Sequence, residues 1–427
     1  MALFGALSTG RSGLDTSGAD LSVIGNNIAN VSTIGFKGSR AEFADLLSAN
    51  AGGETGKIGL GARVGAVRTL FTQGAIESTG RALDLAIQGE GFFVLREGQA
   101  KLFTRAGNFQ ESPTGEITDL LGHPLQGTPL NADGTNAGGV TDVVVAGLSS
   151  QAKATSRATL VANLQADAPV PSPFDEVTPD FQSAFSDQSN YFTNIQIFDS
   201  LGKSHNLTLF FSRVGANTWE VHAGVDAGET GGTPGDLQLL DLNGGTAGLA
   251  ATVTFDSGGK VASTNPATIS GSVTFSGAAA QPITLDLSGL TQFASPSATG
   301  FVNQDGFGAG GLTALDVDAK GILSATFDNG QTRPLFQLAI AKFTAPEGLT
   351  PIGNQLYRES ISSGPPAVAT AQTSGNGSVV SSSLEQSNVA IAQEFISLIS
   401  AQRAFQANSR VITASDTLLN DLINIIR

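Results

Sequence analysis

The sequence predicts a mainly β protein with α-helical termini, in which the N- and C-terminal helices pair as a coiled coil and the β domains between them are nested. Three observations support this fold class. Apolar residues recur every seven positions at both ends, whereas short runs of alternating apolar and polar residues fill the middle. All 16 prolines lie between Pro113 and Pro366, so breakers of regular helix are confined to the interior.

The N-terminal segment, residues 2–31, is predicted to be a helix with one apolar seam. The seam residues are Leu7, Leu14, Leu21 and Ile28, with Ile24 and Val31 on the neighbouring row. The segment also contains Gly5, Gly10, Gly13, Gly18 and Gly25, and each glycine costs an isolated helix about 1 kcal/mol relative to alanine. We therefore expect this segment to be disordered alone and helical only when it is packed.

The middle of the chain is predicted to consist of short strands. Alternation in residues 83–88 and two runs at 92–95 and 102–105 around the turn REGQA predict a first hairpin. A second is predicted from the alternating runs on either side of DSLGKS, with a third strand at 218–223 that carries the only tryptophan. The proline-rich run at 166–179 is predicted to be a loop, and the Gly-rich stretches at 49–65 and 360–383 to be compliant connectors.

The last 44 residues, 384–427, contain neither glycine nor proline and predict one long helix. Ser383 and Gln386 have the spacing of a capping box at its start. At about 1.5 Å per residue the helix would reach roughly 66 Å, more than one chain can cover, so it needs partners. A core helix of an ordinary domain is the alternative, and the length disfavours it. The seam residues are Leu384, Ile391, Leu398, Phe405, Ile412, Leu419 and Ile426, with Phe395 and Ile423 on a second row.

Composition excludes several classes of function. The net charge of −15 disfavours nucleic acid and anionic membrane surfaces as partners, and no apolar run is long enough for membrane insertion. The absence of cysteine excludes disulfides and thiolate chemistry. No metal, cofactor or catalytic site is predicted, because the three histidines are scattered and carboxylates such as Asp316 and Asp318 suit turns and solvent-facing positions. There is no basic residue before Arg11, so any export is expected to occur without a cleaved signal peptide.

Four motifs identify a resemblance to the rod and hook proteins of the bacterial flagellum. They lie at both ends of the chain in the family's order, and together with the middle the resemblance covers roughly two thirds of the sequence. Ala390 and Ser383 depart from the family's usual residues, and residues 212–300 match least. The motifs are GNNIANVSTIGFKGSR (25–40), TGRALDLAIQGEGFFVL (79–95), FTRAGNFQESPTGEITDLLGHPLQG (103–127) and LEQSNVAIAQEFISLISAQRAFQANSRVI (384–412).

The middle of the chain is similar to the hook members of this family. The runs at 197–211 and 311–357 carry that similarity, whereas distal rod members are similar at both ends but shorter. The domain organisation expected on this basis has four parts. These are a terminal helical coiled-coil domain (1–33 plus 383–427), connecting segments (34–71 plus 365–382), an inner β domain (72–148 plus 301–364) and an inserted outer β domain (149–300).

The resemblance implies a structural subunit and not an enzyme. It implies a flexible hollow helical tube in which the terminal helices surround a channel, and which acts as a universal joint that transmits motor torque from rod to filament. Its partners would be many copies of the chain itself, the distal rod protein, the hook cap protein, the hook–filament junction protein and the flagellar type III export apparatus. Its location would be extracellular, in the flagellum.

The sequence leaves two alternative functions open, and it also leaves open the role of a group of asparagines. The chain could be a distal rod subunit with a large insertion or, in a different class, a secreted β-rich adhesin or carbohydrate-active enzyme. Polar residues near the seams either select the register and the subunit or face the channel and solvent. These residues are Asn26, Asn27, Asn30, Asn388 and Asn408.

The expected disorder of the isolated ends can be tested on the dilute monomer. Removing residues 1–33 and 383–427 should remove little helical signal at 222 nm by circular dichroism, because the ends are expected to order only when they are packed. A large loss of helical signal would show that the ends fold without neighbouring copies.

Overall fold

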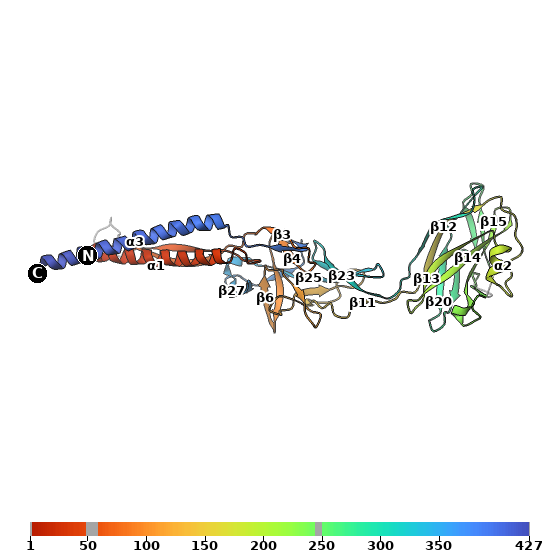
Figure 1. Ribbon diagram of the computed structural model, residues 1–427, viewed down its shortest axis with the longest axis horizontal. Helices are drawn as coiled ribbons and strands as arrows, with labels where there is room; N and C mark the ends of the chain where they lie inside the picture. The colour runs from red at the N-terminus through yellow and green to blue at the C-terminus, as the bar shows by residue number, and fades with distance from the viewer. Residues whose placement is uncertain (1, 48–58, 244–249, 427) are drawn as a thin grey trace. The chain divides into compact units, whose positions relative to one another are not determined.

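The computed structural model describes residues 2–47, 59–243 and 250–426, and the chain forms two compact units (Figure 1). The first unit comprises Met1–Gly147, Ala314–Thr326 and Thr332–Arg427. The second comprises Leu148–Thr313 and Phe327–Gln331, so it is inserted in sequence into the first.

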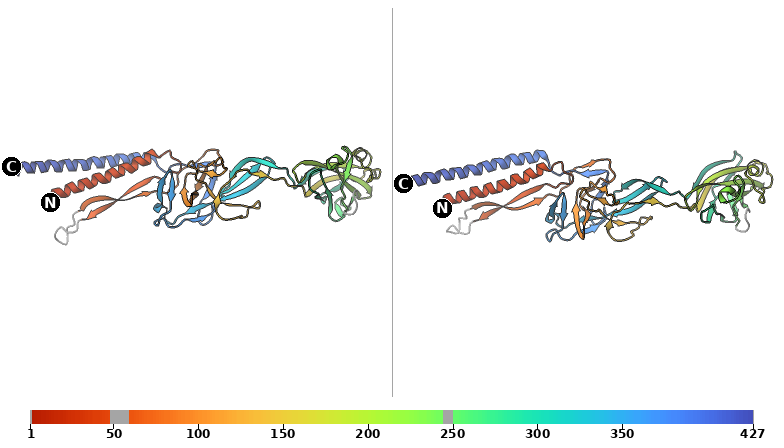
Figure 2. Two further views of the ribbon diagram at one scale, coloured as in Figure 1. Left: turned by 90° about the horizontal axis from the view of Figure 1, so that it is seen from below. Right: turned by 60° about the horizontal axis from the view of Figure 1, so that its bottom comes forward.

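Both ends of the described chain are helical. Helix α1 (Ala2–Ala29) and helix α3 (Ile391–Ile426) lie side by side (Figure 2). The hairpin of β1 (Ser39–Leu47) and β2 (Gly59–Thr69) also packs on α1. Of the predicted connector at 49–65, residues 59–65 belong to β2, and the remainder lies outside the described residues.

The predicted start of the C-terminal helix is wrong. Ser383 and Leu384 belong to strand β31 (Ser383–Glu385), which pairs with β3 (Ile76–Ser78), and α3 begins only at Ile391. The N–H of Ser383 donates to the Asp84 carbonyl at 3.0 Å instead of taking part in a helix cap. Leu384 and its two neighbours in the strand are buried, so ladder pairing and burial override a spacing that also suits a helix.

Besides the β1–β2 hairpin, the described residues of the first unit form two larger sheets and three short strand pairs. One sheet has the order β27 (Thr350–Gly353), β28 (Leu356–Arg358), β6 (Ala100–Thr104), β5 (Phe92–Glu97), β26 (Ile340–Lys342) and β29 (Ala367–Ala369). The other has the order β10 (Thr141–Asp142), β9 (Gln126–Pro129), β25 (Thr332–Leu338), β24 (Ile322–Phe327) and β23 (Gly310–Val317). The short pairs are β3–β31, β4 (Leu85–Gln88) with β30 (Ser378–Ser381), and β7 (Gln110–Glu111) with β8 (Ile117–Thr118).

The stretch at 360–383, predicted to be an extended connector, is tied to the β structure. Strand β29 pairs with β26, β30 pairs with β4, and β31 pairs with β3. Its serines and small residues therefore supply ladder hydrogen bonds, and only the turns between these strands are irregular. The predicted first hairpin is confirmed as β5 and β6.

The described residues of the second unit form two sheets and two short helices. In the first sheet β12 (Arg157–Gln165) lies centrally, and the others are β19 (Ile269–Val273), β20 (Gln281–Asp286), β21 (Thr291–Phe293) and β22 (Ala298–Gln304). The second sheet contains β13 (Tyr191–Phe198), β14 (Ser204–Gly215), β15 (Thr218–Asp226), β16 (Leu237–Leu239), β17 (Ala251–Phe255) and β18 (Val261–Asn265). The remaining elements are α2 (Phe181–Ser186), η1 (Ala227–Thr230) and β11 (Ser149–Ser150), which pairs with the start of β23.

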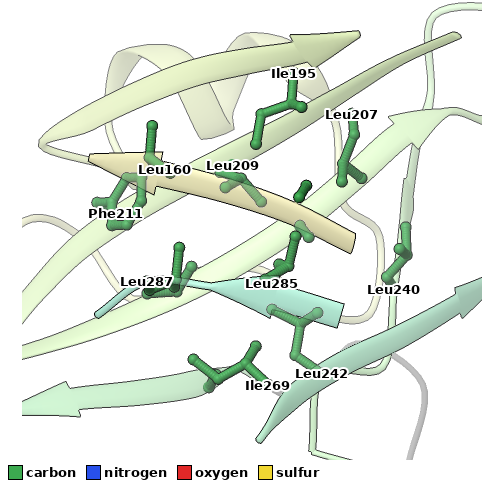
Figure 3. Close-up of a cluster of buried hydrophobic side chains, with 14 of the residues drawn as sticks. Leu160, Ile195, Leu207, Leu209, Phe211, Leu240, Leu242, Ile269, Leu285 and Leu287 are labelled. Carbon is green, nitrogen blue, oxygen red and sulfur yellow. The ribbon is translucent and has the colours of Figure 1, made fainter. Parts of the chain in front are cut away.

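The core of the second unit lies between its two sheets. Figure 3 shows Leu160 of one sheet facing Leu209 and Phe211 of the other, and all three are buried. Trp219 is fully buried, and its indole N–H donates to Gln292 Oε1 at 3.2 Å. The predicted second hairpin and third strand are confirmed as β13, β14 and β15.

The predicted fold class, mainly β with helical termini, is confirmed. No helix in the described ranges is long and apolar enough to cross a membrane.

Candidate self-assembly surface

Helices α1 and α3 pack through small and polar side chains. A Cβ at Gly13 would lie 2.6 Å from the side chain of Asn408, and one at Gly10 would lie 3.0 Å from Ile412 Cγ1. These glycines therefore allow a close approach that any larger residue would obstruct. Because Asn27 bonds to Glu394 while Gly10 faces Ile412, the two helices run antiparallel.

The residues of α3 that face α1 have a seven-residue spacing of their own. Ala401 and Ser415 are buried, and Asn408 Nδ2 contacts Ser17 Oγ at 3.5 Å. Together with Glu394 they form a heptad of small and polar residues beside the apolar one. The sequence contained this signal, but the prediction followed only the large apolar residues.

The predicted seam residues occupy different environments. Ile24 is buried in α1, and Val31 lies in the turn after the helix. Leu384 lies in β31, as described above. Three predicted seam residues of α3 are exposed, namely Ile391, Phe395 and Phe405. Leu7, Leu14, Leu21, Ile28, Leu398 and Ile412 are half-buried, whereas the side chains of Leu419, Ile423 and Ile426 lie outside the described ones.

A large part of the apolar surface of α3 is consequently exposed in a single chain. Phe395 is 48% exposed and Phe405 is 40% exposed. Complete burial of one such side chain is worth about 1.5–3 kcal/mol, so this surface stores a substantial driving force for association. We call these exposed residues together the α3 apolar face, and they are Ile391, Phe395, Ile396, Ile399, Phe405 and Leu418.

Both helices are joined to the β structure at a buried ion cluster. Glu385 Oε1 accepts from Lys37 Nζ at 2.6 Å, and Glu385 Oε2 accepts from Arg105 Nη1 at 3.3 Å. The side chains of Lys37 and Glu385 are completely buried. Burial lowers the pKa of Lys37 even though Glu385 acts in the opposite direction, and burial likewise lowers the pKa of Arg105.

The Glu385 cluster also satisfies backbone groups of neighbouring segments. Lys37 Nζ donates to the Thr72 carbonyl at 2.8 Å, and the Gly74 N–H donates to Glu385 Oε1 at 2.8 Å. The guanidinium of Arg105 donates to the Gly89 carbonyl and lies 5.4 Å from the ring centre of Phe92. The cluster therefore binds the chain after α1, the strand before α3 and the β5–β6 sheet at one point.

Two of the seam asparagines join segments beside this cluster. Asn27 donates to the Ser39 carbonyl at 2.8 Å and accepts from the Ser39 N–H at 2.9 Å. Asn388 accepts from the Gly38 N–H at 2.8 Å and donates to the Leu70 carbonyl at 2.7 Å. Asn30, by contrast, bonds locally at the end of α1, where its side-chain amide and its backbone N–H both donate to the Asn26 carbonyl.

Four protein families of one class match separate segments at both ends and in the middle of the chain. The flagella basal body rod protein family matches residues 7–37, and the flagellar hook protein FlgE/F/G D1 domain matches 86–156. The flagellar basal body protein FlaE D2 domain matches 163–307, and the flagellar basal body rod FlgEFG protein C-terminal family matches 380–425. The class is that of the axial subunits of the flagellar rod and hook.

Comparison with whole proteins narrows the class. The flagellar hook protein FlgE of Treponema pallidum is 31% identical over 99% of this chain and 99% of its own length. That of Escherichia coli is 31% identical over 98% of this chain and its entire length. The chain therefore belongs to the flagellar hook protein family. A crystal structure of Helicobacter pylori flagellar hook protein FlgE2 is 15% identical, covers 71% of this chain and 98% of that chain, and has a TM-score of 0.48.

The close approach of the helices predicts opposite effects for two glycines of α1. Gly18→Ala should stabilise the helix, by about 0.5–1 kcal/mol, because a Cβ there meets nothing within 4 Å. Gly13→Ala should lower the melting temperature of the assembled protein, because its Cβ displaces Asn408. Thermal melts at 222 nm measure both, and equal shifts for the two variants would contradict the packing described here.

The buried ion cluster predicts a large cost for removing its carboxylate. Glu385→Gln should destabilise the first unit by about 3–5 kcal/mol, since two buried cations lose their counter-charge. Urea unfolding followed by circular dichroism measures this change. Glu97→Gln, which breaks a half-exposed pair with Arg358, should cost below about 1 kcal/mol. Trp219 fluorescence should report an unchanged transition of the second unit, and equal costs for the two substitutions would refute the role given to Glu385.

Proposed function

We propose that this chain is the structural subunit of the bacterial flagellar hook, a flexible hollow helical tube that transmits motor torque from the rod to the filament. The single observation that carries the proposal is the α3 apolar face, which α1 leaves exposed in a chain of the hook protein family. Large apolar surfaces of this kind mark interaction sites, and here the sites recur on every copy.

Self-association by unlike surfaces accounts for a polymer. Among the described residues, no apolar surface covers the α3 apolar face, because the side of α3 that packs on α1 meets glycines and polar residues. When such a face binds a different surface of the next copy, the contact is heterologous, and heterologous contacts generate open helices. The predicted seam residues of α1, from Leu7 to Val31, would then contact further copies together with the α3 apolar face.

Flexibility of the tube follows from the division of the chain. The second unit has a core of its own and is inserted into the first, so neighbouring copies could slide at the second unit while the helices stay packed. The proposed location is outside the cell, reached through the flagellar type III export apparatus. The proposed neighbours in the flagellum are the distal rod protein, the hook cap protein and the hook–filament junction protein.

The proposal predicts that assembly depends on the α3 apolar face and that monomer stability does not. Phe395→Asp combined with Phe405→Asp should abolish tube formation, seen by negative-stain electron microscopy of concentrated protein, and should abolish swimming. The urea transition of the monomer should be unchanged, because both rings are already exposed in the single chain. Phe301→Asp, at an equally exposed phenylalanine of the second unit, serves as the matched control and should still give tubes.

Three results would count against the proposed function. These are tubes formed by the double variant, no tube from the unaltered chain, and normal swimming of a strain that lacks the protein. A straight, stiff tube from the unaltered chain would favour a distal rod subunit.

A further inference from the structure

Ile361 is an isoleucine that the first unit holds completely in solvent. Its relative exposure is 103%, and it lies in the turn that follows β28. The turn is built by the side chains of two serines. The Ser360 N–H donates to Ser363 Oγ at 2.9 Å, and the Ser363 N–H donates to Ser360 Oγ at 3.2 Å. Ser363 is itself fully buried, so the turn has a fixed shape.

The turn is also fixed to its surroundings. Ser360 Oγ donates to the Gly348 carbonyl at 2.5 Å, and a Cβ at Gly348 would lie 2.5 Å from the backbone of Ser362. The neighbouring residue Glu347 pairs with Arg68 of β2 at 3.0 Å. A floppy loop would pay conformational entropy on docking, whereas this turn presents Ile361 already ordered.

The same unit contains an open hollow of a size that fits one aliphatic side chain. Its volume is about 160 Å³, and an apolar cavity of roughly 150 Å³ is large enough for a benzene molecule. Two of its wall residues, Leu120 and Leu121, are 68% and 55% exposed, so its apolar wall is in water in the single chain. The lining combines Ala106, Leu120, Leu121 and Leu356 with five polar residues, among which are the carboxylate of Asp119 and the amides of Asn108 and Gln355.

The chemistry of the turn and of the hollow is complementary. The aliphatic side chain of Ile361 would lie against the leucines, and the hydroxyl of the adjacent Ser362 would lie near the amides. The hydroxyl of Ser360 is already bonded within its own chain. The two features belong to opposite ends of one short hairpin. Gln355 and Leu356 lie at the closed end of β27–β28, whereas Ile361 follows the open end. Ile361 therefore cannot reach the hollow of its own chain, where it remains fully exposed.

We propose that Ile361 of one copy inserts into the Leu120–Leu121–Leu356 hollow of a second copy of this chain. The proposal rests on the proposed function, because it adds a contact between β parts of neighbouring copies in the polymer. Since each copy carries both the isoleucine and the hollow, the contact is heterologous and can repeat from copy to copy along an open helical polymer.

The absence of cysteine from the chain allows a direct test by disulfide crosslinking. Polymer carrying Ile361→Cys and Leu121→Cys is oxidised with copper phenanthroline and run on a non-reducing gel. A disulfide requires Cβ atoms about 3.5–4.5 Å apart, so crosslinking reports direct contact. We expect a ladder of dimers, trimers and higher multimers from polymer and none from dilute monomer. Ile361→Cys paired with Val144→Cys, another exposed position of the first unit, should give no ladder.

A second variant measures the strength of the contact. Ile361→Asp should raise the protein concentration needed for polymerisation roughly tenfold or more, the effect of losing one fully buried aliphatic side chain. Val177→Asp, at a valine of the second unit that is 89% exposed, should leave that concentration unchanged.

Several outcomes would overturn the inference, and they separate it from the proposed function. Tubes that form normally but give no ladder from the double-cysteine chain would refute this contact and leave the hook function intact. Dimers from Ile361→Cys alone would show a symmetric contact and refute the heterologous one. An equal concentration for polymerisation of Ile361→Asp and of the unaltered chain would show that Ile361 contacts solvent or a different molecule and not a second copy. Failure of the unaltered chain to form any polymer would refute both proposals together.

Discussion

The carboxylate of Glu385 is the constraint on which the first unit depends. It forms ion pairs with both Lys37 and Arg105, whose side chains are almost completely buried, and a charge buried without such a partner is among the costliest features a protein can carry. Because Lys37 follows α1 and Glu385 precedes α3, the ion cluster determines where both helices leave the β structure. Exposed ion pairs elsewhere, such as Arg358 with Glu97, have no comparable effect because water screens them.

In α3, which begins beside this cluster, one row of residues contacts α1, whereas most of the large apolar residues lie on other sides of the helix. The row with Glu394, Ala401, Asn408 and Ser415 brings α3 close to α1, and the larger apolar residues point elsewhere. This contact leaves the exposed apolar side chains of α3 uncovered, so the free energy of burying them is not gained within one chain. The free energy is instead available from the α3 apolar face, which a neighbouring copy can cover.

Hydrophobic periodicity predicted the existence of both terminal helices and of the main hairpins, because burial on one face imposes a regular spacing. It could not predict against what each face packs. Leu384 continues the heptad perfectly and still belongs to a strand, since pairing with β3 and burial beside Glu385 outweigh a local preference. Glycines lower the intrinsic stability of α1, but Gly10 and Gly13 also permit α3 to approach α1 closely. The second effect depends on a packing partner that the sequence does not identify.

The Glu385 cluster could not be predicted from the sequence, for a different reason. Its members are separated by 68 and 280 positions, from Lys37 to Arg105 and from Arg105 to Glu385, and no local pattern relates residues so far apart. The exposure of Ile361 was equally hidden, because a Ser- and Gly-rich stretch suggests a connector and gives no sign of a turn fixed by serine side chains. Both features arise from tertiary hydrogen bonds.

Folding and assembly are coupled in such a molecule. The β cores of the two units are complete within one chain, so they are stable without neighbours. The glycine-rich α1 and the α3 apolar face gain most of their stability from contacts with other copies, and any partner that binds only the ordered state stabilises that state by mass action. Assembly therefore stabilises the terminal helices, which are the least stable part of the single chain. A tube built in this way holds together along its helices, while the independent core of the second unit leaves that unit free to change its neighbours without unfolding.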